Sequence, residues 1–200
     1  MNDLRKNMDD KSFYIFGLGA IGSNLLMQLA KVYKNPRFYG IDYDIVEERN
    51  IDTQAYLLQQ IGLPKAFAMT VVLNLKSKNI NYAPIERRII SKDDIKNIIM
   101  GEDAVIIDCF DNSESRSLIH GKNCLHVGFS PQYTAEIIWD ENYSVPNDIP
   151  EDQNDICEVS DAVPFINFVV SMACMNIINF VDNNEKNDII ITNKTVIRNL

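Results

Sequence analysis

The sequence is poor in the residues from which small metal sites and disulfide frameworks are built. It has four cysteines, none in a Cys-x-x-Cys pair, and only two histidines, His120 and His126. A structural zinc site usually needs closely spaced ligand pairs, so the sequence predicts no zinc. The irregular cysteine spacing gives no disulfide framework and suits a reducing compartment.

Positive charge is also scarce. Nineteen Lys and Arg residues stand against 28 Asp and Glu, which gives a net charge of −9 and excludes nucleic acid and anionic membranes as favoured partners. The first ten residues contain no apolar segment typical of a signal peptide. The one long apolar stretch, 163–181, contains three asparagines and is flanked by Asp161 and Asp182, a pattern that indicates a buried helix rather than a membrane span. These features predict a cytoplasmic protein.

Apolar strand-like segments alternate with helical ones along the chain. This alternation predicts a single α/β domain over residues 1–200. We expect a Rossmann-like, doubly wound, mostly parallel sheet with helices on both faces and a C-terminal antiparallel portion. Its ligand would bind at the carboxyl ends of the strands. The expected strands are 13–17, 37–41, 80–90, 103–108, 123–128, 134–139, 189–191 and 195–197, and the expected helices are 20–33, 64–78, 92–100, 113–120 and 164–181.

A glycine-rich segment, Gly-Leu-Gly-Ala-Ile-Gly, follows the first predicted strand. Gly17 permits a tight turn, Gly19 lets backbone amides approach a phosphate, and Gly22 lets the helix pack closely on the strand. Ala20 and Ile21 complete the phosphate loop and open the helix, whose N-terminus favours anions. The segment predicts a dinucleotide-type phosphate site; the alternative is a glycine-rich turn without a ligand.

Three further motifs follow in order. Residues 42–54 read Asp-Tyr-Asp-Ile-Val-Glu-Glu-Arg-Asn-Ile-Asp-Thr-Gln, residues 62–66 read Gly-Leu-Pro-Lys-Ala, and residues 108–116 read Asp-Cys-Phe-Asp-Asn-Ser-Glu-Ser-Arg. With the glycine loop, they resemble the ThiF/MoeB family of adenylyltransferases, which shares its fold with the ubiquitin-activating enzymes. The resemblance covers about residues 12–181.

The resemblance implies that a carboxylate attacks the α-phosphate of ATP to give an acyl-adenylate and pyrophosphate. Lys65 matches the family's phosphate-binding lysine and Asp111 its magnesium-binding aspartate. Asp42 matches the ligand of the ribose, and Asn50 and Gln54 match polar residues of the nucleotide pocket. The implied cofactors are ATP and magnesium. The implied partners are a small ubiquitin-like or sulfur-carrier protein or peptide, and a second copy of the chain in a homodimer.

Several of these residues have a simpler interpretation. Lys65 can be a solvated helix residue, and Asp44, a second candidate nucleotide ligand, can face solvent. Asp111 and Asn112, also assigned to the nucleotide, can cap the helix that follows. Arg116 is interpreted as structural rather than catalytic.

Two positions leave the function open. Cys157 lies where some family members carry a cysteine that links covalently to the carrier, and it can also be a plain loop cysteine. Thr53 stands where the family has an arginine, and threonine cannot replace that charge. The leading hypothesis is therefore an adenylyltransferase. A catalytically silent nucleotide-binding partner module and, on Gly17 to Asp42 alone, an NAD-dependent oxidoreductase remain as alternatives.

Overall fold

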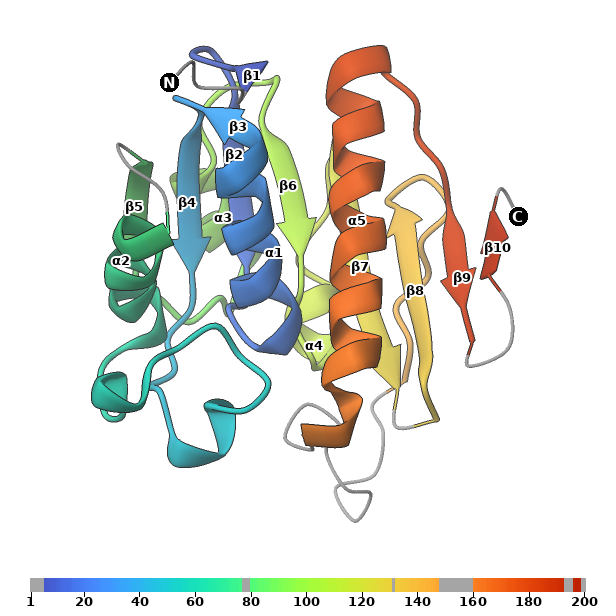
Figure 1. Cartoon of the computed structure of the whole chain (residues 1–200). Coiled ribbons are helices and arrows are strands. Elements are labelled where there is room, and N and C mark those ends of the chain that lie inside the picture. Colours follow the sequence, from blue (N-terminus) through green and yellow to red (C-terminus); the bar gives the residue numbers. More distant parts are fainter. Residues whose placement is uncertain (1–5, 77–79, 131, 148–159, 193–195, 199–200) are drawn as a thin grey trace.

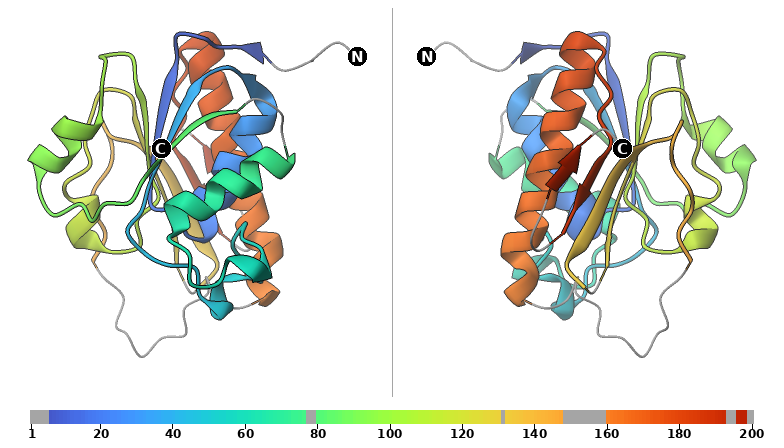
Figure 2. Two further views of the ribbon diagram at one scale, coloured as in Figure 1. Left: turned by 90° about the vertical axis from the view of Figure 1, so that its left-hand side faces the viewer. Right: turned by 90° about the vertical axis from the view of Figure 1, so that its right-hand side faces the viewer.

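A computed structural model of the chain describes residues 6–76, 80–130, 132–147, 160–192 and 196–198. It shows an eight-stranded sheet in the order β10-β9-β8-β7-β6-β2-β4-β5, with helices on both faces (Figures 1 and 2). The strands from β5 to β7 run parallel, and β8, β9 and β10 continue the sheet antiparallel. The predicted Rossmann-like architecture is confirmed. The strands are β1 (Lys6–Asn7), β2 (Ser12–Phe16), β3 (Tyr33–Lys34), β4 (Arg37–Ile41), β5 (Asn81–Ile85), β6 (Val105–Asp108), β7 (Cys124–Ser130), β8 (Thr134–Trp139), β9 (Ile189–Ile191) and β10 (Val196–Arg198), and the helices are α1 (Ala20–Val32), α2 (Lys65–Lys76), α3 (Lys92–Ile98), α4 (Ser113–Arg116) and α5 (Val163–Asn183).

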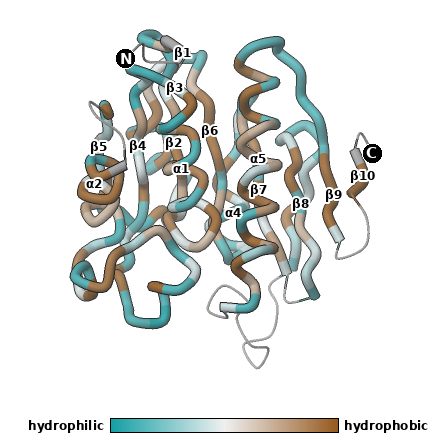
Figure 3. The backbone as a smooth tube through the Cα atoms, viewed as in Figure 1, coloured by the Kyte–Doolittle hydropathy of each residue, from teal (hydrophilic) through white to brown (hydrophobic). Residues whose placement is uncertain are grey.

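Strand β2 is apolar throughout because both of its faces are covered. Phe13 and Ile15 belong to an apolar cluster beneath α1, α2 and α5, whereas Tyr14 and Phe16 belong to a second cluster on the side of α3 and α4. Successive strand residues point to opposite faces, so a central strand needs apolar residues at every position. Figure 3 shows this concentration of apolar residues along the central strands, with hydrophilic residues at the turns and after α5.

Helix α5 lies beside α1 across one face of the sheet (Figure 1). The segment Ser160–Asn183 is long and apolar enough to cross a membrane by length and composition, but half of its apolar window is buried inside the protein. Gln28 of α1 donates to Ser171 of α5 at 3.3 Å. Packing against α1 and the sheet therefore accounts for the hydrophobicity of this helix.

Two elements end four or more residues before their predicted ends. Strand β5 ends at Ile85, not at residue 90, because it lies at the edge of the sheet and its partner β4 ends at Ile41, the residue paired with Ile85. The charged residues 86–88 that follow are exposed. Helix α4 ends at Arg116, not at residue 120, because the backbone bonds then change to a three-residue spacing, from the Leu118 amide to the Ser115 carbonyl and from the Ile119 amide to the Arg116 carbonyl. Short 3₁₀ turns at 48–50 and 58–60, which the sequence did not predict, fill the connection between β4 and α2.

The three central parallel strands end at the same level of the sheet. Phe16 is in register with both Ile41 and Asp108. The residues that follow these positions are Gly17, Asp42 and the 109–112 loop. The fold thus brings together the three motifs that the sequence analysis singled out.

Candidate functional site

The glycine-rich turn follows β2 directly, and packing requires two of its three glycines. Gly17 has a φ of +82°, and a Cβ there would lie 2.8 Å from the Cys109 carbonyl oxygen. A Cβ on Gly22 would lie 1.9 Å from the Gly17 carbonyl oxygen. A Cβ on Gly19, in contrast, would meet nothing within 4 Å. Gly17 and Gly22 therefore shape the turn, while Gly19 borders open space.

Helix α1 begins at the turn with its N-terminus uncapped by any side chain. Gly19 occupies the N-cap position in an extended conformation, and the buried residues Ala20 and Ile21 form the first turn. A helix N-terminus presents backbone N–H groups and a partial positive charge. This end of α1 is therefore suited to an anionic group such as a phosphate.

Asp42 fastens the glycine turn to the end of β4. Its Oδ2 accepts from the Leu18 amide at 2.7 Å, and its Oδ1 accepts from the Asp44 amide at 2.8 Å. Burial raises the pKa of Asp42 above its ordinary value, against the opposing effects of the Lys65 charge and of these amide hydrogen bonds. Each carboxylate oxygen has a second lone pair, so Asp42 can still accept from a ribose hydroxyl.

Residues 53–56 cross the first turn of α1 and are bonded to it. Ser23 Oγ donates to the Gly19 carbonyl at 2.7 Å and accepts from the Ala55 amide at 3.1 Å. Asn24 Nδ2 donates to the Thr53 carbonyl at 2.9 Å. The segment that carries Thr53 and Gln54 is thereby held against the glycine turn.

Tyr56 adds a further bond to the same turn. Its hydroxyl donates to the Leu18 carbonyl at 2.7 Å. Because Leu18 also donates its amide to Asp42, both backbone polar groups of this residue are fixed by side chains. The glycine turn is therefore preorganised before any ligand binds.

Lys65 lies at the start of α2 and is directed towards the acidic segment. Its Nζ forms an ion pair with Asp44 Oδ2 at 3.2 Å, and its backbone amide donates to the Asp44 carbonyl at 2.8 Å. The Lys65 side chain is 10% exposed and that of Asp44 is 48% exposed. The alternative interpretation of Lys65 as a solvated helix residue is wrong. Asp44, for which the alternative was a solvent-facing side chain, is half-exposed and forms an ion pair with Lys65.

Asn50 and Gln54 differ in how their side chains are used. Asn50 is buried, and its Oδ1 accepts from the Glu47 amide at 2.9 Å to close a 3₁₀ turn. Gln54 Oε1 is buried with no hydrogen-bond partner among the described residues. Such an orphaned acceptor is costly, so Gln54 is the polar group of this segment that a ligand or a small rearrangement would satisfy.

The 109–112 loop carries the third motif. Asp111 is exposed, and its Oδ1 accepts from Asn112 Nδ2 at 3.2 Å. Asn112 Oδ1 accepts from the Ser115 amide at 2.8 Å and so caps α4. The capping function suggested for Asn112 is confirmed, while the Asp111 side chain is exposed to solvent.

The sequence profile of one protein family matches residues 2–197, almost the whole chain. The chain belongs to the ThiF family. The predicted family relationship is confirmed. Comparison with curated proteins finds no match.

Solved structures share the fold of this ThiF-family chain. PaaA superimposes with a TM-score of 0.73 at 16% identity, covering 96% of this chain and 64% of PaaA. E. coli MccB crystallised with ATP gives a TM-score of 0.70 at 14% identity, covering 96% and 63% of the two chains. The microcin C7 biosynthetic enzyme MccB in complex with N-formylated MccA gives 0.71 at 16% identity, with 96% and 64% covered. The ThiF-family chain thus spans just under two thirds of the length of these proteins.

Arg116 has a structural position in this ThiF-family chain, in agreement with its sequence-based interpretation. Its guanidinium donates to the carbonyls of Phe110 at 2.5 Å and Val127 at 2.7 Å, and to the Tyr143 hydroxyl at 2.8 Å. The side chain is buried, and the negative charge of Asp108 raises the pKa of Arg116 against the lowering effect of burial. Arg116 joins the 109–112 loop to β7.

Arg116→Met is expected to lower the free energy of unfolding by about 2–4 kcal/mol, because it leaves buried carbonyl groups without donors. Chemical denaturation measures the change. The matched control is Arg88→Met, at an exposed arginine, which should change stability by no more than about 0.5 kcal/mol. Equal effects of the two substitutions would contradict the structural assignment of Arg116.

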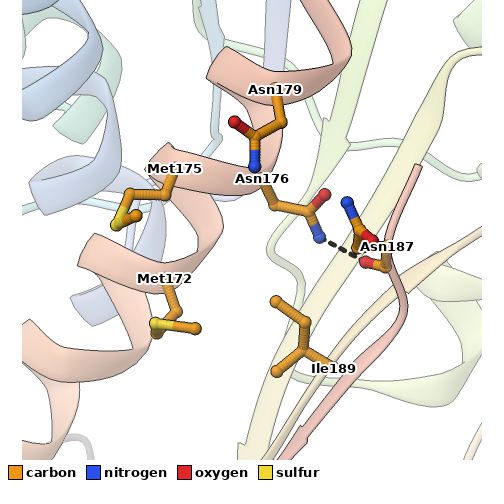
Figure 4. A pocket seen from close by; sticks show the side chains of 6 residues that line it. All are labelled: Met172, Met175, Asn176, Asn179, Asn187 and Ile189. Carbon is orange, nitrogen blue, oxygen red and sulfur yellow. Dashed lines mark hydrogen bonds between the residues drawn. The ribbon is translucent and has the colours of Figure 1, made fainter. Parts of the chain in front are cut away.

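A small pocket lies away from the ThiF-family motifs, between the C-terminal half of α5 and the start of β9 (Figure 4). Asn176 Nδ2 donates across it to the Asn187 carbonyl at 2.5 Å. Its lining includes Met172, Met175 and Ile189 and carries no charged side chain. None of the residues that line the pocket belongs to the glycine turn, to the 42–54 or 62–66 segments or to the 109–112 loop.

Sequence analysis missed three residues that hold the glycine turn and the neighbouring segment in place. One of its candidate residues also lies outside the part of the chain that the structure describes. Ser23 and Asn24 follow Gly22 directly, and this adjacency was the available signal that they would sit on the first turn of α1. Nothing in the sequence indicated Tyr56. Cys157 lies outside the described residues, so its covalent role stays a prediction.

Proposed function

We propose that the chain is an ATP- and magnesium-dependent adenylyltransferase. Its substrate would be the C-terminal carboxylate of a small ubiquitin-like or sulfur-carrier protein or of a peptide. The observation that carries the proposal is the open space beside Gly19, at an uncapped helix N-terminus, within a turn fixed by Asp42 and next to the segment that pairs with Lys65. Membership of the ThiF family and the crystallisation of MccB with ATP support it.

The residues present fit the nucleotide. The backbone amides of Gly19 to Gly22 would donate hydrogen bonds to phosphate oxygens, and the Asp42 carboxylate would accept hydrogen bonds from the ribose hydroxyls. Gln54 brings an unpaired acceptor to the same turn. Lys65 would move its charge from Asp44 to the phosphates, since one contact at 3.2 Å holds its ammonium group to the Asp44 carboxylate.

In the proposed reaction, a carboxylate oxygen attacks the α-phosphorus of ATP. The new oxygen–phosphorus bond gives an acyl-adenylate, and the bond to the bridging oxygen breaks to release pyrophosphate. Negative charge grows on the leaving phosphates, and Lys65 with the amides of α1 would stabilise it. Asp111, exposed at the edge of the loop, would hold magnesium, which neutralises phosphate charge when bound.

The partner and the assembly are parts of the same proposal. MccB was crystallised with MccA, and this supports a second molecule bound at the adenylating fold. We place the protein in the cytoplasm as a homodimer with a carrier protein or peptide as its partner.

ATP with magnesium is expected to raise the melting temperature of the chain by about 5–10 °C at a hundredfold excess over Kd, because a ligand that binds only the folded state stabilises it. NAD should raise it less. Differential scanning fluorimetry with both nucleotides measures the difference, and isotope exchange between pyrophosphate and ATP with candidate carriers measures adenylation. Tight NAD binding without ATP binding would contradict the proposal and favour an oxidoreductase.

A catalytically silent nucleotide-binding module is the second candidate, and Thr53 favours it. The Thr53 side chain, which stands in place of the family arginine, is buried and uncharged. The backbone carbonyl of Thr53 accepts a hydrogen bond from Asn24 Nδ2. In that case ATP would raise the melting temperature, whereas no carrier would support pyrophosphate exchange. The same two measurements therefore separate both candidates.

A further inference from the structure

Three potential metal ligands converge on the sheet face opposite α1 and α5. They are His120 in the turn after α4, His126 in β7, and Asp140 directly after β8. One ligand atom from each lies within 4.8 Å of the others. The sequence shows no close ligand pair here, because the turn and the antiparallel β7–β8 pairing bring these residues together only in the fold.

The hydrogen bonds of the His120 and His126 rings favour a positive charge between the two rings and Asp140. His126 Nδ1 lies 2.8 Å from Asp108 Oδ2, and His120 Nε2 lies 3.1 Å from the Ser117 carbonyl. With these outer nitrogens protonated, neutral rings carry lone pairs on the inner nitrogens, His126 Nε2 and His120 Nδ1. Those nitrogens lie 3.0 and 2.8 Å from Asp140 Oδ1, which is itself an acceptor when ionised. Three lone pairs facing one another repel unless positive charge lies among them, either as ring protons or as a metal ion.

We propose that His120 Nδ1, His126 Nε2 and an Asp140 carboxylate oxygen bind one divalent transition-metal ion of the zinc class. Two imidazoles with one carboxylate are donors that zinc and its neighbours prefer, whereas magnesium and calcium take oxygen ligands. Tetrahedral zinc with bonds of 2.0–2.2 Å places its ligand atoms about 3.3 Å apart, so a small outward shift admits the ion. His120 is 48% exposed and can make that shift, and solvent can supply the ion and a fourth ligand.

The surroundings of the ligands match the outer shell that metal sites require. Metal-bound histidines usually donate their other ring N–H to a carboxylate or carbonyl. Asp108 serves His126 in this way, and both side chains are fully buried. Asp140 Oδ2 accepts from the Gly121 amide at 3.2 Å, and the Tyr143 ring stacks on His126 at 3.6 Å between centroids. The orientation of each ligand is thus fixed by groups outside the set.

The ion would join the turn after α4 to β7 and to the end of β8. Asp108 connects this site to the nucleotide site, because its Oδ1 accepts from the Phe110 amide at 3.0 Å, next to Asp111. Cys124 Sγ lies 3.5 Å from His126 Nε2, so a thiol also borders the site. The proposed metal is distinct from the magnesium assigned to Asp111.

The test uses the full chain, stripped with a chelator and titrated with zinc in the absence of nucleotide. We expect one zinc per chain by calorimetry and elemental analysis, and a rise in melting temperature that chelator reverses. His120→Ala and Asp140→Asn should each weaken zinc binding at least about tenfold, since loss of even an outer-shell partner costs 10–100-fold. His120 is used rather than the buried His126 because its removal leaves the core intact.

Asp111→Asn is the matched control, because it removes an exposed carboxylate from the other site and should leave zinc affinity unchanged. Cobalt substitution gives a second readout: d–d absorption bands should appear in wild type and disappear in His120→Ala. Failure of wild type to retain zinc, or equal affinity in His120→Ala, would overturn the proposal. So would nitrogen NMR showing both rings doubly protonated and unaffected by zinc, because ring protons would then supply the charge. None of these outcomes depends on adenylation.

Discussion

Lys65→Met is expected to lower the rate of acyl-adenylate formation by about 10²–10³-fold, the usual cost of losing one group that stabilises transition-state charge. Methionine keeps an apolar stem of similar length in the buried position and removes only the ammonium group. Asp44 is half-exposed, so water can solvate it once its partner is gone. Pyrophosphate exchange measures the rate, and circular dichroism verifies the fold.

Lys31→Met, in an exposed lysine at the far end of α1, is the control and should retain the wild-type rate. Asp111→Ala should show a loss similar to that of Lys65→Met, without a change in melting temperature, because Asp111 is exposed. Near-normal rates in both Lys65→Met and Asp111→Ala would place the chemistry elsewhere in the chain.

Gly22→Ala is expected to destabilise the protein by at least about 3 kcal/mol, at the upper end of the cost of overpacking. The added Cβ would lie 1.9 Å from the Gly17 carbonyl oxygen, so the backbone itself must move. The collision involves the turn and the first helical residues together, and relief requires α1 to lift from β2. Denaturant unfolding, or loss of soluble protein, measures the effect.

Gly19→Ala separates folding from binding at the same turn. Its Cβ meets nothing within 4 Å, and φ at this position is −75°, outside the left-handed region that favours glycine. Stability should therefore stay within about 1 kcal/mol of wild type. Nucleotide affinity should fall, because the new methyl group occupies the space proposed for phosphate. If Gly22→Ala proved as stable as Gly19→Ala, the close packing described for the turn would be incorrect.

The sequence was sufficient for the architecture because the central strands carry a simple signal. Val105–Asp108 is apolar at each position before its final aspartate, as a strand buried on both faces must be. The antiparallel terminal pair was also predictable: Ile191 pairs with Val196 as the two short apolar runs suggested. The end of α4 could not be predicted, because the change to three-residue backbone hydrogen bonds after Arg116 is marked by no glycine or proline in residues 117–120.

The candidate site was predictable in its motifs and less so in its contacts. Asp42 and Lys65 could be selected because the glycine turn and strand ends fix where such residues must lie. The bond from Tyr56 to Leu18 could not, since a single tyrosine in an irregular segment carries no periodic signal. The grouping of His120, His126 and Asp140 depends on β7–β8 register and on a turn, neither of which local sequence encodes.

The position of β2 between β4 and β6 has a consequence for the order in which the protein can become active during synthesis. Phe13 pairs with Phe38 on one side and with Val105 on the other. A nascent chain can form the first pairing early, but the second must wait until the middle of the chain has left the ribosome. Until then the glycine turn lacks the Cys109 carbonyl against which Gly17 is packed, and the loop bearing Asp111 does not yet exist. Nucleotide added to a translating ribosome should therefore protect the chain from protease only after β6 has emerged.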